Sequence, residues 1–200
     1  MPQCVVEHRI DGPPAPSTND GQTVYLFNGL EDYKDVVSII QPVLGWNSDY
    51  GSAWGIASWN CCASGVTWEA PPAPVNSGDH LEGYVFMNCA AGTKTCSSWD
   101  IVTYDVTNGN FSELLDTPNV GQTFNWAFGG VLEVYNIVQC GDYPAPPFDN
   151  FYGGIGFYNQ SVLNDKFVQI KPAWKVSTAS GLTPSCNYGG TTPQEVILNY

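Results

Sequence analysis

The chain has 200 residues, of which 43% are hydrophobic and 12% are charged, and 19 acidic against six basic side chains give it a formal charge of −13. A chain of this length and composition forms one domain with a sizeable core. The negative charge repels phosphates and anionic lipids, which excludes nucleic acid and membrane surfaces as expected partners.

Residues 11–22 are rich in Gly, Pro, Asn and Asp, so we expect no regular structure there and place the first strand proper near Thr23. We predict an N-terminal arm or edge segment over 1–22 and a single domain over 23–200. Short β-branched and aromatic runs then alternate with turn residues. In chain order, the predicted strands are 23–28, 37–46, 53–60, 65–69, 80–89, 98–105, 110–115, 122–128, 130–139, 152–159, 166–170 and 194–199.

The pattern within these runs indicates an all-β fold. Segments 80–87 and 99–106 alternate apolar and polar residues with period two, and no segment has a sustained helical period. Gly78-Asp79 and Asn108-Gly109 are turn signals, because Gly and Asn accept positive φ. Pro71–Pro74 and 142–150 are expected to be loops. We predict one antiparallel β-sandwich of the jelly-roll, lectin-like kind.

Seven cysteines leave at least one without an intramolecular partner. The spacing of Cys89 and Cys96 fits a hairpin tip and makes them the favoured pair, ahead of Cys140 with Cys186. The adjacent Cys61 and Cys62 are not expected to bridge each other. Two histidines and the absence of a CxxC motif argue against a zinc site.

Two polar residues stand inside apolar runs: Gln41 in the run 36–44 and Glu133 in the run 129–135. Each faces either a ligand site or a costly desolvated interior, and a buried carboxyl tends to have a raised pKa. Such groups are candidates for a functional site. The plain alternative is that both residues point to solvent on alternating strands.

The spacing around Gln41 resembles that of the eqolisin glutamic peptidases. Segment 27–31, Phe-Asn-Gly-Leu-Glu, is followed ten residues later by Gln41, and it resembles the family pattern Trp-x-Gly-Ile-Asp followed at the same spacing by Leu-Gln-Thr-Gly. Ala57-Ser-Trp59, Gly78-Asp-His-Leu81 and Leu132-Glu-Val134 also resemble family segments. The likeness covers roughly residues 23–160.

The resemblance implies two bent antiparallel sheets, with Gln41 and Glu133 projecting from neighbouring strands onto a concave face. It implies Glu133 as general base and then general acid, Gln41 as stabiliser of the oxyanion, and Glu31 as a supporting carboxylate. The family's Thr-Gly after the glutamine is here Pro42-Val43, and its Trp after the glutamate is Val134. Displacement of about 1 Å can cost roughly a hundredfold in rate, so these departures are sufficient to silence the pair.

The aromatic residues favour a binding function. The candidates for a ligand-binding face are Phe27, Trp46, Trp59, Trp126 and Tyr135. Flat rings of this kind bind sugars, peptides or planar molecules by stacking. A second likeness, tied to no particular motif, is to the small chromoproteins of oyster mushrooms, which have a lectin-like sandwich.

No cofactor is required by either interpretation, although a small chromophore or a calcium ion remains open. Asp142 and Asp149, with Asp32 and Asp35, offer oxygen ligands for calcium without the spacing of an EF-hand. Three classes of function follow. The first is a non-catalytic ligand- or pigment-binding protein, the second is an acid-acting glutamic endopeptidase, and the third is a carbohydrate-binding lectin.

The start of the sequence lacks the charged and apolar regions of a signal peptide, and no apolar run reaches 18 residues. We therefore expect either a cytoplasmic protein or the mature form of a secreted one. The high charge favours a monomer, or a weak homo-oligomer formed through an edge strand.

Overall fold

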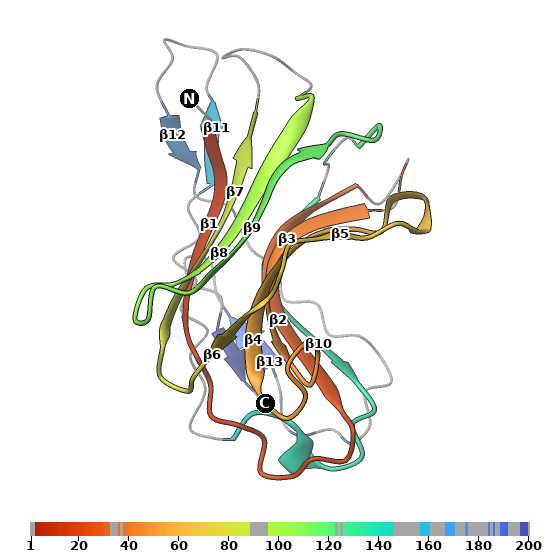
Figure 1. The fold of residues 1–200 in the computed structure, drawn as a ribbon, viewed down its shortest axis with the longest axis vertical. Helices are drawn as coiled ribbons and strands as arrows, with labels where there is room; N and C mark the ends of the chain where they lie inside the picture. Colours follow the sequence, from red (N-terminus) through yellow and green to blue (C-terminus); the bar gives the residue numbers. More distant parts are fainter. Residues whose placement is uncertain are drawn as a thin grey trace.

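A computed structural model provides the three-dimensional structure of the chain. It describes residues 3–32, 36, 38–88, 96–122, 124, 126–145, 157–160, 167–170, 175, 184, 186, 189–191 and 197–199. Two antiparallel sheets pack as layers, and the strands of both are joined by turns and loops (Figure 1). The predicted all-β antiparallel sandwich is confirmed.

The first sheet has four strands in the order β1-β7-β8-β9. Its strands are β1 (Gln3–Asp11), β7 (His80–Met87), β8 (Ser98–Asp105) and β9 (Phe111–Pro118). Strand β1 pairs only with β7, so the N-terminal segment that we predicted as an arm or edge contains an edge strand of this sheet. Asn108-Gly109 turns β8 into β9, with Gly109 at φ +77°, as the turn signal predicts.

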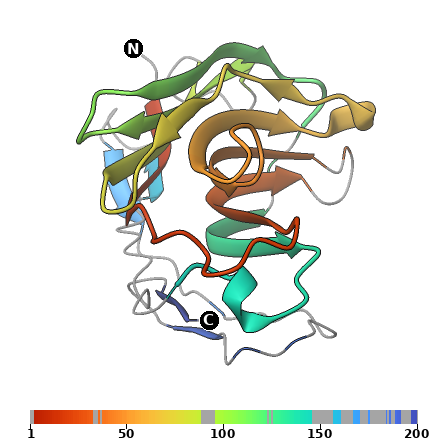
Figure 2. The same ribbon diagram turned by 60° about the horizontal axis from the view of Figure 1, so that its bottom comes forward.

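The second sheet has six strands, in the order β10-β2-β3-β4-β5, with β6 also paired to β4. The strands are β2 (Thr23–Asp32), β3 (Ser38–Trp46), β4 (Trp54–Cys61), β5 (Trp68–Glu69), β6 (Ala73–Val75) and β10 (Trp126–Tyr135). Figure 2 shows β10, β2, β3 and β4 following one another across the sheet. Two two-stranded pairs complete the described strands: β11 (Phe157–Gln160) with β12 (Phe167–Ile170), and β13 (Gly189–Thr191) with β14 (Ile197–Asn199).

Helical structure in the described ranges is confined to two 3-10 turns, Ala63–Gly65 and Cys140–Asp142. No helix among the described residues is long and apolar enough to cross a membrane.

The structure corrects two predicted boundaries. Segments 122–128 and 130–139 were predicted as two strands, but β10 runs through from Trp126 to Tyr135 and its register against β2 shifts between Phe128 and Val131. The two glycines between them form a bulge, which bends a strand without ending it. The predicted loop Pro71–Pro74 contains the start of β6, whose Pro74 pairs with Gly55 at the edge of the sheet, where proline is tolerated.

The side chains between the two sheets form two apolar clusters. One cluster includes Leu26, Trp46 and Ile56, and the other includes Ile40, Val85 and Ile101. On β10 the bulge changes the parity, so that Ala127 points inward before it and Leu132 and Val134 point inward after it. On β2, β3 and β4 the inward-pointing residues carry even numbers, because strand residues alternate between faces. The odd-numbered residues of these strands therefore point to the opposite face, which we call the outer face.

Polar side chains occupy the interface between the two apolar clusters. Asn28, Ser58, Thr103 and His8 come from four different strands, and all are buried. The hydroxyl oxygens of Ser58 and Thr103 lie 2.9 Å apart across the two sheets. Buried polar groups cost free energy unless they are hydrogen-bonded, so this polar row favours the alignment of the two sheets in which its members can pair.

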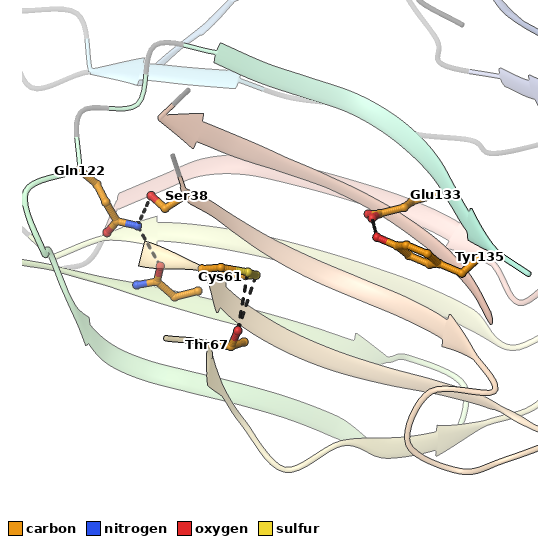
Figure 3. The surroundings of a disulfide bond; sticks show 8 residues. Ser38, Cys61, Thr67, Gln122, Glu133 and Tyr135 are labelled. Carbon is orange, nitrogen blue, oxygen red and sulfur yellow. Dashed lines mark hydrogen bonds between the residues drawn. A yellow bond between two sulfur atoms is a disulfide. The ribbon is translucent and has the colours of Figure 1, made fainter. Parts of the chain in front are cut away.

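A second buried network closes one end of the interface. Gln122 Nε2 donates to Ser38 Oγ at 2.8 Å and to Asn60 Oδ1 at 2.9 Å, and Asn60 Nδ2 donates to Thr117 Oγ1 at 2.9 Å. Figure 3 shows Gln122 and Ser38 meeting at the end of the sheet where β3 begins.

Three cysteine predictions meet the structure differently. Cys140 and Cys186 form a disulfide with 5.5 Å between their Cα atoms, as predicted. Cys96 is disulfide-bonded, but its predicted partner Cys89 lies outside the described residues. Cys61 and Cys62 are bonded to each other, contrary to the prediction. The Thr67 hydroxyl contacts both of their sulfur atoms (Figure 3).

Candidate functional site

The outer face of the six-stranded sheet carries most of the predicted site residues. Gln41 on β3 is paired with Trp59 on β4, and Glu133 on β10 is paired with Tyr25 on β2. Directly paired residues of antiparallel strands point to the same face. Gln41 and Glu133 therefore share the outer face, and so do Phe27 and Glu31, which alternate with Tyr25 along β2.

Gly29 explains the local structure around Gln41. A Cβ atom at Gly29 would lie 2.7 Å from the backbone oxygen of Ile40 and 3.3 Å from Cβ of Gln41. Strands β2 and β3 therefore approach each other too closely here for any side chain but hydrogen, which accounts for the glycine in the 27–31 segment. Gln41 itself is 4% exposed, and its buried Oε1 has no hydrogen-bond partner among the described residues.

The prediction that Gln41 and Glu133 project from neighbouring strands is wrong, because β2 lies between β3 and β10. Along β2, Glu133 stands opposite Tyr25 and Gln41 stands beside Gly29. Four residue steps and two strand spacings place their Cα atoms roughly 16 Å apart. Figure 3 shows Glu133 towards one end of the sheet, with Ser38, at the start of Gln41's strand, towards the other.

Glu133 has a partner of its own. The Tyr135 hydroxyl donates to Glu133 Oε1, and this hydrogen bond, together with burial, raises the pKa of Tyr135 to about 12. The pair lies at the edge of the sheet on β10, and Tyr135 is 52% exposed. The carboxylate is thus engaged within its own strand rather than with Gln41.

A row of aromatic rings runs across the outer face from β4, whose Trp59 is paired with Gln41, to β10, whose Tyr135 contacts Glu133. Tyr25 meets Trp59 edge-on with ring centroids 5.3 Å apart, and it meets Tyr135 edge-on at 6.3 Å. Gly45 makes room for the row, since a Cβ atom there would lie 3.3 Å from the Tyr25 ring. Trp59, Tyr25 and Tyr135 therefore form a continuous aromatic row from β4 to β10.

The other predicted ligand-binding aromatics divide between the two faces. Trp126 lies opposite Glu31 on the outer face and is 52% exposed. Phe27 points to the same face but is buried. Trp46 belongs to the core between the sheets, where it packs against Trp54 at 5.4 Å, so its prediction as a ligand contact is wrong. Its even position on β3 turns it inward.

Sequence reasoning missed Tyr25, which lies at the centre of the aromatic row. The signal was present, because Tyr25 precedes Phe27 by two residues and therefore shares its face. What the sequence did not reveal is that Trp59 of β4 and Tyr135 of β10 both meet the Tyr25 ring edge-on, and that Gly45 leaves room for this ring.

Glu31, the predicted supporting carboxylate, has a perturbed environment. Burial raises its pKa, and the neighbouring charge of Asp32 raises it further. Glu31 stands beside Trp126 and Ile39 on the outer face, one alternation away from Gln41. It is therefore closer to Gln41 than Glu133 is.

The predicted calcium ligands are not brought together among the described residues. Asp142 is buried and accepts hydrogen bonds from Thr18 Oγ1 at 2.6 Å and from the backbone N–H groups of Val138 and Gln139. Burial alone would raise the pKa of Asp142, but these hydrogen bonds outweigh it and hold the pKa below its usual value. Its carboxylate thus anchors the turn at 138–142.

Asp149 and Asp35 lie outside the described residues. No group of three or more His, Cys, Asp or Glu side chains that could hold a metal ion was found in the described part of the chain. Calcium at Asp142 remains a prediction.

Two solved structures of a glutamic peptidase are similar to this chain. One is scytalido-glutamic peptidase with a transition state analog inhibitor, at 14% identity and a TM-score of 0.48, and the other is the same peptidase with a peptide based transition state analog, at 12% identity and a TM-score of 0.46. Each comparison covers 100% of this chain and 92% of the peptidase.

No protein-family model and no curated protein matches the chain. The two structures are of a glutamic peptidase, the class of enzyme whose motif segment 27–41 resembles.

Proposed function

We propose that the chain is a non-catalytic ligand-binding protein that holds a small ligand on the outer face of the six-stranded sheet. The observation that carries the proposal is the aromatic row of Trp59, Tyr25 and Tyr135, which runs across the outer face from the residue paired with Gln41 to the hydrogen-bond partner of Glu133. A row of rings held edge to edge presents flat apolar surfaces with polar tips, a combination suited to planar molecules, sugars or peptide side chains.

The separation of Gln41 and Glu133 supports a non-catalytic function. A general base must lie within hydrogen-bond reach of the water that it deprotonates, and the oxyanion stabiliser must reach the same reacting centre. Cα atoms roughly 16 Å apart are a wide separation for two side chains that must reach one tetrahedral carbon. In addition, the hydrogen bond from Tyr135 occupies one oxygen of the Glu133 carboxylate.

The first experiment is the absorption spectrum of the protein purified from its natural source. A resident planar ligand is expected to absorb beyond the aromatic band, to leave on solvent extraction, and to rebind to the refolded protein. Trp59→Ala and Tyr25→Ala are each expected to weaken rebinding about 5- to 30-fold, because each removes a stacking surface worth about 1–2 kcal/mol.

The matched control is Phe111→Ala, which removes an exposed ring from the four-stranded sheet. Equal rebinding by all of these variants would place the ligand elsewhere and contradict the proposal. If no ligand is recovered and a glycan array gives binding that Trp59→Ala abolishes, the ligand is a carbohydrate and the protein is a lectin.

A glutamic endopeptidase is the second candidate, favoured by the shared face of Gln41 and Glu133 and by the spacing of the 27–41 motif. The test is hydrolysis of a denatured protein substrate between pH 2 and 4. We expect no turnover above that of Glu133→Gln. Turnover that Glu133→Gln and Gln41→Ala both abolish would establish the peptidase and overturn the binding proposal.

A further inference from the structure

Carboxylates gather on one side of the aromatic row. Glu69 on β5 is paired with Trp59 on β4, so the two side chains share the outer face. Asp49, in the loop between β3 and β4, lies within hydrogen-bonding contact of Glu69. Trp59 therefore has Glu69 with Asp49 on one side and Gln41 on the other.

The charge of these carboxylates is not balanced within the sheet. The six strands β2, β3, β4, β5, β6 and β10 contain no Lys, Arg or His. Burial raises the pKa of Glu69, the Trp59 indole partly offsets that rise, and the nearby Asp49 charge adds to it. The negative charge that these two neighbouring carboxyl groups carry favours the approach of a cation.

Gln41 supplies a second, independent sign of a missing partner. The side chain is 4% exposed, and its Oε1 has no hydrogen-bond partner in the part of the chain that the structure describes. A buried acceptor left unsatisfied costs about 1–3 kcal/mol, so native structures rarely retain one without a reason. The missing partner must be a hydrogen-bond donor, because a carbonyl oxygen only accepts.

The aromatic rings favour the same kind of ligand. Tryptophan is the aromatic residue whose ring attracts cations most strongly, and Trp59 belongs to this type. Tyr25 stands edge-on to Trp59, with the ring centroids 5.3 Å apart. Carboxylates, an amide oxygen and an electron-rich ring all attract positive charge and accept hydrogen bonds. An ammonium or guanidinium group satisfies all of them, since it carries several donors and no acceptor.

We propose that Trp59, Glu69, Asp49 and Gln41 form a subsite for an organic cation, an ammonium or guanidinium group attached to the ligand of the outer face. The inference rests on the proposed binding function and names the chemistry of its ligand. The ring of Trp59 stacks on the cation, Glu69 and Asp49 neutralise it, and Gln41 Oε1 accepts one of its N–H bonds.

The test uses three probes of matched shape: 2-naphthylmethylammonium, 2-naphthylmethanol and 2-naphthoate. Their binding to the whole protein is measured by titration calorimetry at pH 7. The cation is expected to bind about tenfold or more tightly than the alcohol, and the carboxylate is expected not to bind. Added salt is expected to weaken the binding of the cation and to leave the binding of the alcohol unchanged.

Variants assign the effect to the subsite. Glu69→Gln is expected to reduce the affinity for the cation to about that for the alcohol, while Trp59→Ala weakens both. Glu113→Gln is the matched control, because it removes the same charge from an exposed position on β9 of the other sheet. An equal loss in Glu69→Gln and Glu113→Gln would mean attraction to the net charge alone and would overturn the subsite.

The outcomes separate this inference from the proposed function. Equal binding of cation and alcohol, both lost in Trp59→Ala, would overturn the cation subsite and leave the aromatic binding face intact. No binding by any probe would also overturn the subsite, while the spectrum and the rebinding experiment decide the proposed function by themselves.

Discussion

Acid should destabilise this sandwich through His8, a histidine buried between the sheets. Desolvation lowers the pKa of His8 to about 4 from 6.5, although contact with Asn28 opposes the shift. The native protein therefore resists protonation of His8, while the unfolded chain accepts the proton at pH 6.5. Stability is complete above pH 6.5 and is lost progressively as the pH falls from 6.5 to about 4.

The size of the effect follows from the shift. About 2.5 pKa units at 1.36 kcal/mol each give a loss of about 3 kcal/mol from this one group. That is a large part of the 5–15 kcal/mol by which domains are typically stable. The structure has little room to rearrange around a protonated His8, because the His8 ring packs directly against Gly83 of β7.

The assay is urea denaturation at pH 7.5, 6, 5 and 4, with the free energy of unfolding extrapolated to water at each pH. His8→Gln keeps a neutral side chain of similar size and is expected to lose about 3 kcal/mol less than the wild type between pH 7.5 and 4. His80→Gln is the control, because the pair that His80 forms with Asp11 is exposed and contributes little. Parallel curves for wild type and His8→Gln would refute the reasoning.

Three further predictions concern stability. Gly83→Ala is expected to cost about 2–3 kcal/mol, since the new Cβ would lie 2.0 Å from the His8 ring, and urea denaturation should show a smaller cost in a His8→Ala background. Removing the disulfide with Cys140→Ser and Cys186→Ser should cost up to about 4 kcal/mol, because the bond closes a loop across a sequence separation of 46, and an unchanged Tm would contradict this. Asp142→Asn should cost about 1–3 kcal/mol at pH 7 and progressively less as acid protonates the native carboxyl, so an equal cost at all pH values would count against the assigned hydrogen bonds.

The fold was predictable from the sequence because its signals are local. The alternation in 80–87 and the Asn108-Gly109 turn need only a few neighbouring residues to act, and both are found in β7 and in the β8–β9 turn. The bulge at 129–130 was not predictable, because a pair of glycines in a sequence is equally typical of the end of a strand and of a bulge within a continuous strand. The strand continues here because β10 pairs with β2 on both sides of the glycines.

The candidate site was predictable only in part, because motif spacing gives the strand of a residue and not the order of strands in the sheet. Gln41 and Glu133 lie on strands and on one face, as the resemblance implies. Their separation arises from β2, which joins the sheet between them through long-range pairing. The carboxylate pair of Glu69 and Asp49 depends on a loop folding back, which a single sequence does not encode as a pattern.

The polar row between the sheets has a consequence for how the outer face can change. Apolar contact has no direction, so two purely apolar sheets have many nearly equivalent alignments. The hydrogen bond between Ser58 and Thr103 forms only at a particular distance and angle. Sliding either sheet by two residues would leave these buried groups without hydrogen bonds, at a cost of about 1–3 kcal/mol each. The polar row thus fixes the alignment of the two sheets. Residues such as Trp59 and Glu69 lie on the outer face, away from this interface, so they can be substituted to suit a new ligand while the alignment is kept.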